Sequence, residues 1–220
     1  MTFAYENDVK NKVLQNVTFK IRKGEKICLM GPQGAGKSTL LKLLTGAYPD
    51  HEGNILLNNI SLGNYDLQSL RNNTGILLSQ QDIFNGTLLE NITMGNRSIT
   101  VEQILILANQ LNLNTYLADL KDGFNTQLYP AGEKLSRKII HKILLLRALI
   151  NTPQLLLLED PFDMEQSTRE SIMNYLLTLD STVIATFNNI DLAKKFDTII
   201  YFQDGIIKAY GKWDDIKDSL

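Results

Sequence analysis

Nine consecutive residues, Gly31–Thr39, bring together three glycines, a lysine and two hydroxyl side chains in the order GPQGAGKST. The order fits the pattern G-x-x-x-x-G-K-[ST], in which glycines let successive backbone N–H groups turn inward and form a nest for anionic oxygens. At this spacing Lys37 is expected to reach the β- and γ-phosphates of a nucleotide, and Ser38 to offer its hydroxyl to Mg²⁺. We therefore predict a site for nucleotide phosphates and Mg²⁺, with the phosphates in contact with the loop residues Gly31, Gly34, Ala35, Gly36, Lys37, Ser38 and Thr39.

Two acidic residues, Glu159 and Asp160, follow a run of four leucines at 155–158 and precede Pro161. A short apolar run of this kind predicts a buried strand. Ligands of parallel sheets bind outside the carboxyl ends of the strands, so this strand and the phosphate loop should end at the same place. We expect both carboxylates to act at the phosphate site rather than merely to end a strand.

The segments that must position these residues alternate between strand and helix patterns. Helical spacing with a glycine stop marks 37–46, and turns are expected at Asn58-Asn59 and Gln203-Asp204-Gly205. The other expected elements are strands at 2–5, 17–21, 26–30, 155–159, 181–186, 197–202 and 205–210, and helices at 167–179 and 190–196. Such alternation predicts an α/β fold, a phosphate-loop NTPase core with a mainly parallel sheet flanked by helices. We expect one domain over 1–220, with an N-terminal antiparallel β subdomain and a helical subdomain inserted at about 85–150.

Composition excludes several classes of function. A net charge of −2 and a pI near 5.7 give no basic surface for nucleic acid, so no nucleic-acid partner is expected. The single cysteine, Cys28, lies in an apolar run and is predicted to be a core residue. No apolar stretch approaches the ~18–20 residues that a membrane-spanning helix needs. The chain starts directly on a strand-like segment, as a domain from a longer polypeptide would.

In order and spacing, these motifs resemble the nucleotide-binding domain of an ATP-binding cassette (ABC) transporter, over nearly all of the chain. Two further pieces, L-x-x-L-R at 67–71 and F-N-G-T-x-x-E-N-I at 84–92, are similar to the exporter type, in which a transmembrane domain precedes the cassette. The resemblance implies an ABC-type ATPase at the cytoplasmic face of the cell (inner) membrane. It also implies two partners, namely a transmembrane domain of the same or another chain and a second ATP-binding domain in a head-to-tail homo- or heterodimer.

The resemblance assigns roles to residues outside the phosphate loop. Tyr5 is the candidate to stack on adenine, with a core tyrosine on an edge strand as the alternative. The family's glutamine that contacts Mg²⁺ falls on Ser79 in an ungapped alignment and on Gln80 one place later, and Gln80 is kept as a cofactor and metal candidate. Ser136 is retained in the signature loop, which in the family caps the γ-phosphate held by the opposite subunit.

The chain departs from the family pattern at catalytic positions. The family places a metal-side aspartate before a water-orienting glutamate, so here Glu159 takes the metal side and Asp160, one methylene shorter, the water side. The catalytic candidates are Asp160, Glu159 and Lys37, and the metal candidates are Ser38, Glu159 and Gln80. The switch histidine is replaced by Phe187 or Asn188, depending on the alignment. A role for Asp163 in dimer contact is doubtful.

The signature loop, usually L-S-G-G-Q, reads LSRKI at 135–139. Arg137 and Lys138 replace glycines that let the backbone approach phosphate, so either a charged phosphate contact or a solvated helix start is possible. Together the departures predict an exporter ATPase with slow hydrolysis. The alternatives are a hydrolysis-deficient nucleotide-binding module in a regulatory or structural role, and a soluble small-molecule kinase, against which the mid-chain helices argue.

Overall fold

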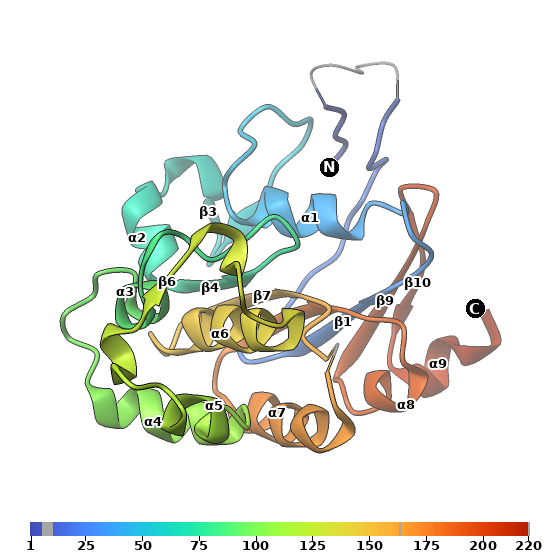
Figure 1. Cartoon of the computed structure of the whole chain (residues 1–220). Coiled ribbons are helices and arrows are strands. Elements are labelled where there is room, and N and C mark those ends of the chain that lie inside the picture. Colours follow the sequence, from blue (N-terminus) through green and yellow to red (C-terminus); the bar gives the residue numbers. More distant parts are fainter. Residues whose placement is uncertain (6–10, 163, 220) are drawn as a thin grey trace.

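The computed structural model describes residues 1–5, 11–162 and 164–219 (Figure 1). The strands are β1 (Lys26–Met30), β2 (Leu56–Leu57), β3 (Ile60–Ser61), β4 (Thr74–Leu77), β5 (Gly86–Thr87), β6 (Gln127–Leu128), β7 (Leu155–Glu159), β8 (Thr182–Thr186), β9 (Thr198–Gln203) and β10 (Ile206–Gly211). The helices are α1 (Lys37–Leu44), α2 (Leu67–Asn72), α3 (Leu88–Thr93), α4 (Val101–Gln110), α5 (Asn114–Ala118), α6 (Arg137–Leu149), α7 (Gln166–Thr178), α8 (Ile190–Ala193) and α9 (Trp213–Ile216).

Six strands form the central sheet in the order β10-β9-β1-β8-β7-β4. All neighbours pair in parallel except β10, which returns antiparallel to β9 through a turn where Asp204 and Gly205 have positive φ. The strand with the phosphate loop therefore lies beside β8, and β8 lies beside the acid-bearing β7. This arrangement confirms the predicted α/β fold, with small antiparallel pairs β2–β3 and β5–β6 beside the main sheet.

Alternate residues of each strand enter different halves of the core, because successive side chains in a strand point to opposite faces. In β1, Ile27 and Leu29 pack with α1, whereas Cys28 and Met30 pack with residues of α6 and α7. Cys28 is fully buried, as predicted. Figure 1 shows the same layering, with α1 on one side of the sheet and α4 to α7 on the other.

The expected strands near the N-terminus form only in part. Residues 17–21 do not form a strand, and Thr2 and Phe3 make isolated bridges to Glu52 and Leu14. The predicted helix at 190–196 is shorter, because α8 ends at Ala193. Strand propensity reflects how a side chain fits a pleated surface, and here no continuous neighbouring strand supplies a ladder.

The stretch between β4 and β7 is mainly helical and contains α3 to α6 together with the short β5–β6 ribbon. Thr87 and Thr100 begin α3 and α4 with capping boxes, in which Glu90 and Gln103 reach back to the cap amides. None of the helices in the described part of the chain is long and apolar enough to cross a membrane.

Candidate nucleotide-binding site

The phosphate loop joins the end of β1 to the start of α1. Its three glycines all have a backbone conformation that favours glycine, and at Gly31 and Gly36 there is also no space for a Cβ. Gly31, Gly34 and Gly36 all have φ between +81° and +134°. A Cβ on Gly31 would lie 2.0 Å from the Phe202 carbonyl oxygen, and one on Gly36 would lie 2.6 Å from a Leu14 methyl carbon. A larger residue at either position would displace the loop from the sheet.

Lys37 lies over the loop that precedes it. Its Nζ donates to the carbonyl oxygens of Gly31, at 2.6 Å, and Pro32, at 2.8 Å. Burial lowers the pKa of Lys37, and the negative charges of Asp160 and Glu159 counter part of that effect. The ammonium group is therefore close to the loop and electrostatically coupled to both acids.

Glu159 connects three parts of the site. One carboxylate oxygen accepts a hydrogen bond from Ser38 Oγ, and the other accepts from the Ser79 backbone amide at 2.7 Å. Burial alone would raise the pKa of Glu159, but the hydrogen bonds from Ser38 and Ser79 outweigh burial and lower it. Because its pKa is lowered, Glu159 is a charged carboxylate at neutral pH, beside the hydroxyl of the phosphate loop.

Asp160 is exposed at the carboxyl end of β7, in a left-handed conformation with φ +45°. Its backbone amide donates to the Thr186 carbonyl oxygen at 3.0 Å, which ties it to the end of β8. A left-handed conformation costs a non-glycine residue roughly 1 kcal/mol or more. The turn therefore redirects the chain at the predicted water-side acid.

The two candidates for the switch position face different surroundings. Phe187 is buried, with its ring 5.0 Å from that of Phe162 and 5.1 Å from that of Phe196. Asn188 is exposed, and its Oδ1 accepts from the Gly31 amide at 3.2 Å. Only Asn188 of these two contacts the phosphate loop.

The nucleotide-contact candidates outside the loop lie at its edges. The Tyr5 hydroxyl is 3.0 Å from Thr39 Oγ1, and its ring packs edge-on against Phe3 and Tyr48. Gln80 is exposed and follows Ser79, whose amide reaches Glu159. The sequence left Ser79 as the alternative to Gln80 at the glutamine position, but did not predict that the Ser79 backbone amide would contact Glu159.

Ser136 lies outside this group of residues. It caps α6 by accepting from the Ile139 amide at 3.3 Å. Lys138, in the first turn, forms an ion pair with Glu165 at 3.0 Å, and Lys142 approaches Glu165 at 3.6 Å. A hydrogen bond from its own backbone amide, and then that from Lys138, lower the pKa of Glu165 to about 2.

Of the two replacements in the signature loop, Lys138 is thus bound to a carboxylate within its own chain. Arg137 is exposed at the start of α6. Asp163, considered for a dimer contact, lies outside the described residues.

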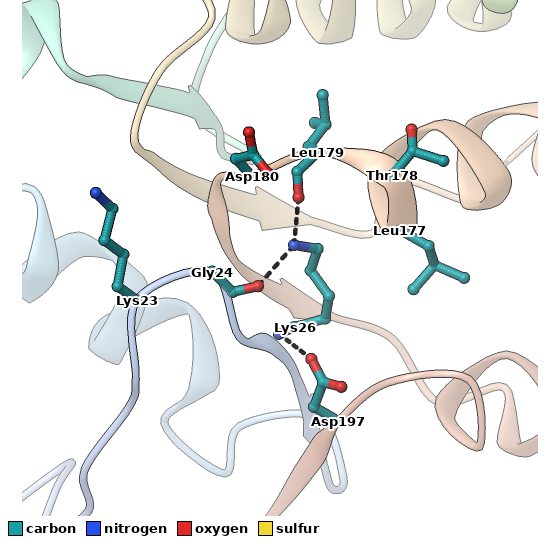
Figure 2. A pocket seen from close by; sticks show the side chains of 8 residues that line it. All are labelled: Lys23, Gly24, Lys26, Leu177, Thr178, Leu179, Asp180 and Asp197. Atoms are coloured by element: carbon teal, nitrogen blue, oxygen red, sulfur yellow. Dashed lines mark hydrogen bonds between the residues drawn. The ribbon is translucent and has the colours of Figure 1, made fainter.

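A cavity of about 640 Å³ lies at the opposite end of β1, where Lys23, Thr178 and Asp180 are among its lining residues (Figure 2). The Lys26 side chain is almost fully buried there and donates to the carbonyl oxygens of Gly24, Leu179 and Ser181 at 2.7–2.8 Å. All three ammonium hydrogens therefore have acceptors. We assign Lys26 a structural role, because it joins the starts of β1 and β8 to the end of α7.

The family model described as ABC transporter matches residues 14–163. The chain belongs to the ABC transporter family. It is an ABC-type ATP-binding domain, and the matched residues include the phosphate loop and both acids of the site described above.

Several proteins similar to this ABC domain are named as export or translocation proteins. It is 29% identical to the putative multidrug export ATP-binding/permease protein YgaD of Bacillus subtilis, over 99% of the chain and 38% of that protein. It is 30% identical to the alpha-hemolysin translocation ATP-binding protein HlyB of Escherichia coli O157:H7, over 99% of the chain and 32% of that protein. The chain thus spans only about a third of the length of these relatives.

Among solved structures, this ABC domain matches a bacterial Atm1-family ABC exporter with ATP bound. The TM-score is 0.88 at 26% identity, and the match covers 99% of this chain and 38% of the other. The likeness over almost the whole chain agrees with the sheet order and with the position of the phosphate loop after β1.

Proposed function

We propose that this chain is the ATP-binding domain of a membrane exporter and that it couples binding and slow hydrolysis of Mg·ATP to transport. The observation that carries the proposal is the contact between Ser38 of the phosphate loop and Glu159 at the end of β7, with Asp160 next in the chain. This contact joins the phosphate-binding loop to the acids that a phosphoryl-transfer site needs.

The residues around Ser38 and Glu159 fit Mg²⁺. A hydroxyl and a charged carboxylate are oxygen donors, which Mg²⁺ prefers, and Mg²⁺ commonly takes its remaining ligands from phosphates and water. No group of three or more histidine, cysteine or acidic side chains gathers for a metal among the residues described. Ser38 and Glu159 would therefore hold Mg²⁺ together with the nucleotide, with Gln80 near by, and Mg²⁺ would neutralise charge on the phosphates.

The chain's own residues divide the remaining work. The inward-facing amides of the loop and the Lys37 ammonium bind phosphate oxygens, and Tyr5 offers its ring to the base. Asp160 orients water toward the γ-phosphate and accepts its proton. Asn188 offers an amide instead of an imidazole, so it can form hydrogen bonds but cannot take up or release a proton.

Hydrolysis is slow on this proposal because Asp160 is one methylene shorter than glutamate. Errors of about 1 Å in placing a reacting group cost on the order of 100-fold in rate. We expect turnover below about 1 s⁻¹, at the lower end of typical enzyme rates.

The partners follow from the same proposal. The chain pairs head-to-tail with a second ATP-binding domain, so that Ser136 of each faces the nucleotide of the other. It works at the cytoplasmic face of the cell (inner) membrane beneath a transmembrane domain of the same or another chain. Residues 85–150 form the helical subdomain, and the exposed Phe84 and Tyr129, which flank the β5–β6 ribbon, are offered to the membrane domain.

Binding and turnover of Mg·ATP by the purified protein test the proposal. We expect Lys37→Ala to weaken binding and Asp160→Asn to retain binding while reducing the slow turnover further. Failure of the wild type to bind Mg·ATP at millimolar concentration would remove the proposed function. Fast turnover by the wild type alone, lost in Asp160→Asn, would remove the claim of slow hydrolysis.

A further inference from the structure

Arg169 on α7 holds the segment that follows Asp160. Its Nε donates to the Phe162 carbonyl oxygen at 3.1 Å, and its Nη2 donates to the Met164 carbonyl oxygen at 3.0 Å. The rigid fork of a guanidinium group can bridge two carbonyls in this way, whereas a lysine ammonium is a single point charge on a flexible stem. Arg169 therefore holds the main chain at Phe162 and at Met164.

The other end of the same segment is held by the sheet. The Asp160 amide is bonded to the Thr186 carbonyl oxygen at 3.0 Å, and Pro161, which has a fixed φ, comes next. The Phe162 ring is buried against Phe187. Asp160 thus stands in a left-handed turn. Thr186 holds the turn at the Asp160 amide, and Arg169 holds the chain two residues later, at the Phe162 carbonyl.

Arg169 and the site share a surface. A cavity of about 360 Å³ is lined by both Arg169 and Asp160, and Asn188 lines it as well. Among its lining residues, which also include Phe162, Phe187, Asn189 and Leu192, Arg169 is the cation and Asp160 the acid. A shift of the loop at Phe162 would therefore move the cavity wall beside the water-side carboxylate.

We propose that Arg169 is a positioning residue for ATP hydrolysis, which fixes the backbone of Asp160 so that its short carboxylate can address the attacking water. The inference rests on the proposed role of Asp160. A carboxylate that is already one methylene short tolerates little further displacement. Loss of the two contacts that Arg169 makes should therefore affect the chemical step and not nucleotide binding.

The test is a double-mutant cycle on the complete protein, with Arg169→Lys, Asp160→Asn and the two combined. Arg169→Lys keeps the charge but has one nitrogen in place of Nε and Nη2, the two atoms that contact the Phe162 and Met164 carbonyls, so it cannot keep both contacts in their present geometry. We expect its kcat for ATP to fall about tenfold while the KM for Mg·ATP stays within twofold. In the Asp160→Asn background the same change should have no further effect on kcat. Arg97→Lys, at an exposed arginine, is the matched control.

The possible results separate the two proposals. If the wild type does not bind Mg·ATP, the proposed function fails. If the wild type binds it but shows no turnover, or if Asp160→Asn has no effect, the inference fails because Asp160 has no role for Arg169 to support. If Asp160→Asn lowers kcat but Arg169→Lys does not, only the inference fails.

A purely structural role for Arg169 would give a different pattern. The loss of kcat would then appear equally in the Asp160→Asn background, in parallel with a lower melting temperature, and would overturn the proposal. If Arg169→Lys folds poorly, Arg169→Ala with millimolar guanidinium provides a second measurement. Recovery of kcat only where Asp160 is intact supports positioning, and recovery in both backgrounds, or in neither, counts against it.

Discussion

Arg147 in α6 ties the helical part of the chain to the segment that follows Ser79. Its guanidinium group donates to the Asn91 carbonyl oxygen at 2.6 Å, to Asn91 Oδ1 at 3.0 Å and to the Asp82 carbonyl oxygen at 3.1 Å. The Asn91 carbonyl lies in the last turn of α3, where no intrahelical partner is available. The Asn91 side chain is fully buried and also bonds both main-chain groups of Phe84.

Replacing Arg147 by methionine keeps an unbranched stem and removes all three donors. Hydrogen bonds from charged donors contribute about 1.5–3 kcal/mol each, but water replaces some of them because Arg147 is only partly buried. Burial of the guanidinium also lowers the pKa of Arg147, so removal relieves some desolvation. We expect a net loss of about 2–4 kcal/mol, which for a domain of this size lowers the melting temperature by about 4–16 °C.

Urea unfolding followed by circular dichroism measures the effect on the purified protein. Arg147→Lys should lie between the wild type and Arg147→Met, because one nitrogen cannot take the places of Nε, Nη1 and Nη2, from which the three contacts are made. Arg71→Met, at an exposed arginine in the last turn of α2, is the control and should change stability by less than about 0.5 kcal/mol. An Arg147→Met protein as stable as the wild type would refute the view that this network holds the segment.

Three further changes test other parts of the structure. Lys26→Met should lower the free energy of unfolding by about 2–3 kcal/mol, because three carbonyls lose a charged donor. Lys23→Met, in the wall of the same cavity, should change this free energy little, and urea titrations of both variants measure the difference. Glu165→Gln should destabilise by less than about 1 kcal/mol, because exposed pairs are weak. A lowered acid pKa stabilises the fold above the unfolded value of about 4.3. The difference between Glu165→Gln and the wild type should therefore be full above about pH 5 and fade as the pH falls toward the folded pKa of about 2. Asp160→Glu extends the carboxylate by about 1.5 Å and should raise kcat tenfold or more in an ATPase assay; unchanged turnover would show that reach does not limit the rate.

The phosphate loop and the acid pair were predictable because both depend on local sequence and one sheet rule. The glycine spacing specifies the loop, and the carboxyl ends of β1 and β7 meet because the strands are parallel. Ser38 and Glu159 are in contact accordingly.

The different surroundings of Phe187 and Asn188 could also have been predicted from the sequence. Val183 and Ala185 point to one face of β8, and continuing that alternation places Phe187 on the same face and Asn188 on the other. The structure follows the alternation, with Phe187 in the core and Asn188 at Gly31.

Other features depend on contacts that no local pattern encodes. Residues 17–21 have strand-forming side chains, but Val17 pairs with the terminal residue Met1 and, in the part of the chain that the structure describes, no ladder continues from this pair: the Val17 amide donates to the Met1 carbonyl oxygen at 2.8 Å, and the Met1 amino group donates to the Val17 carbonyl oxygen at 2.6 Å. The contacts of Arg147 and Arg169 reach main-chain carbonyls, which every residue possesses. A cation within an apolar helix signals that a partner must exist, but not which carbonyl it is.

The positions at which this chain departs from the family pattern limit how complete a nucleotide site could be in any dimer. In the proposed head-to-tail arrangement, each nucleotide site would take the phosphate loop, acids and Asn188 from one chain and the signature loop from the other. This chain departs from the family pattern on both surfaces, through Asp160 and Asn188 on one and through Arg137 and Lys138 on the other. A homodimer would repeat both departures at both sites. If the partner had all the usual residues, its own phosphate loop would still face Lys138 of this chain. The other site, built on the phosphate loop of this chain, would still contain Asp160 in place of the usual glutamate. Pairing can therefore repair one half of each site but complete neither, so slow turnover would be a property of every assembly that includes this chain.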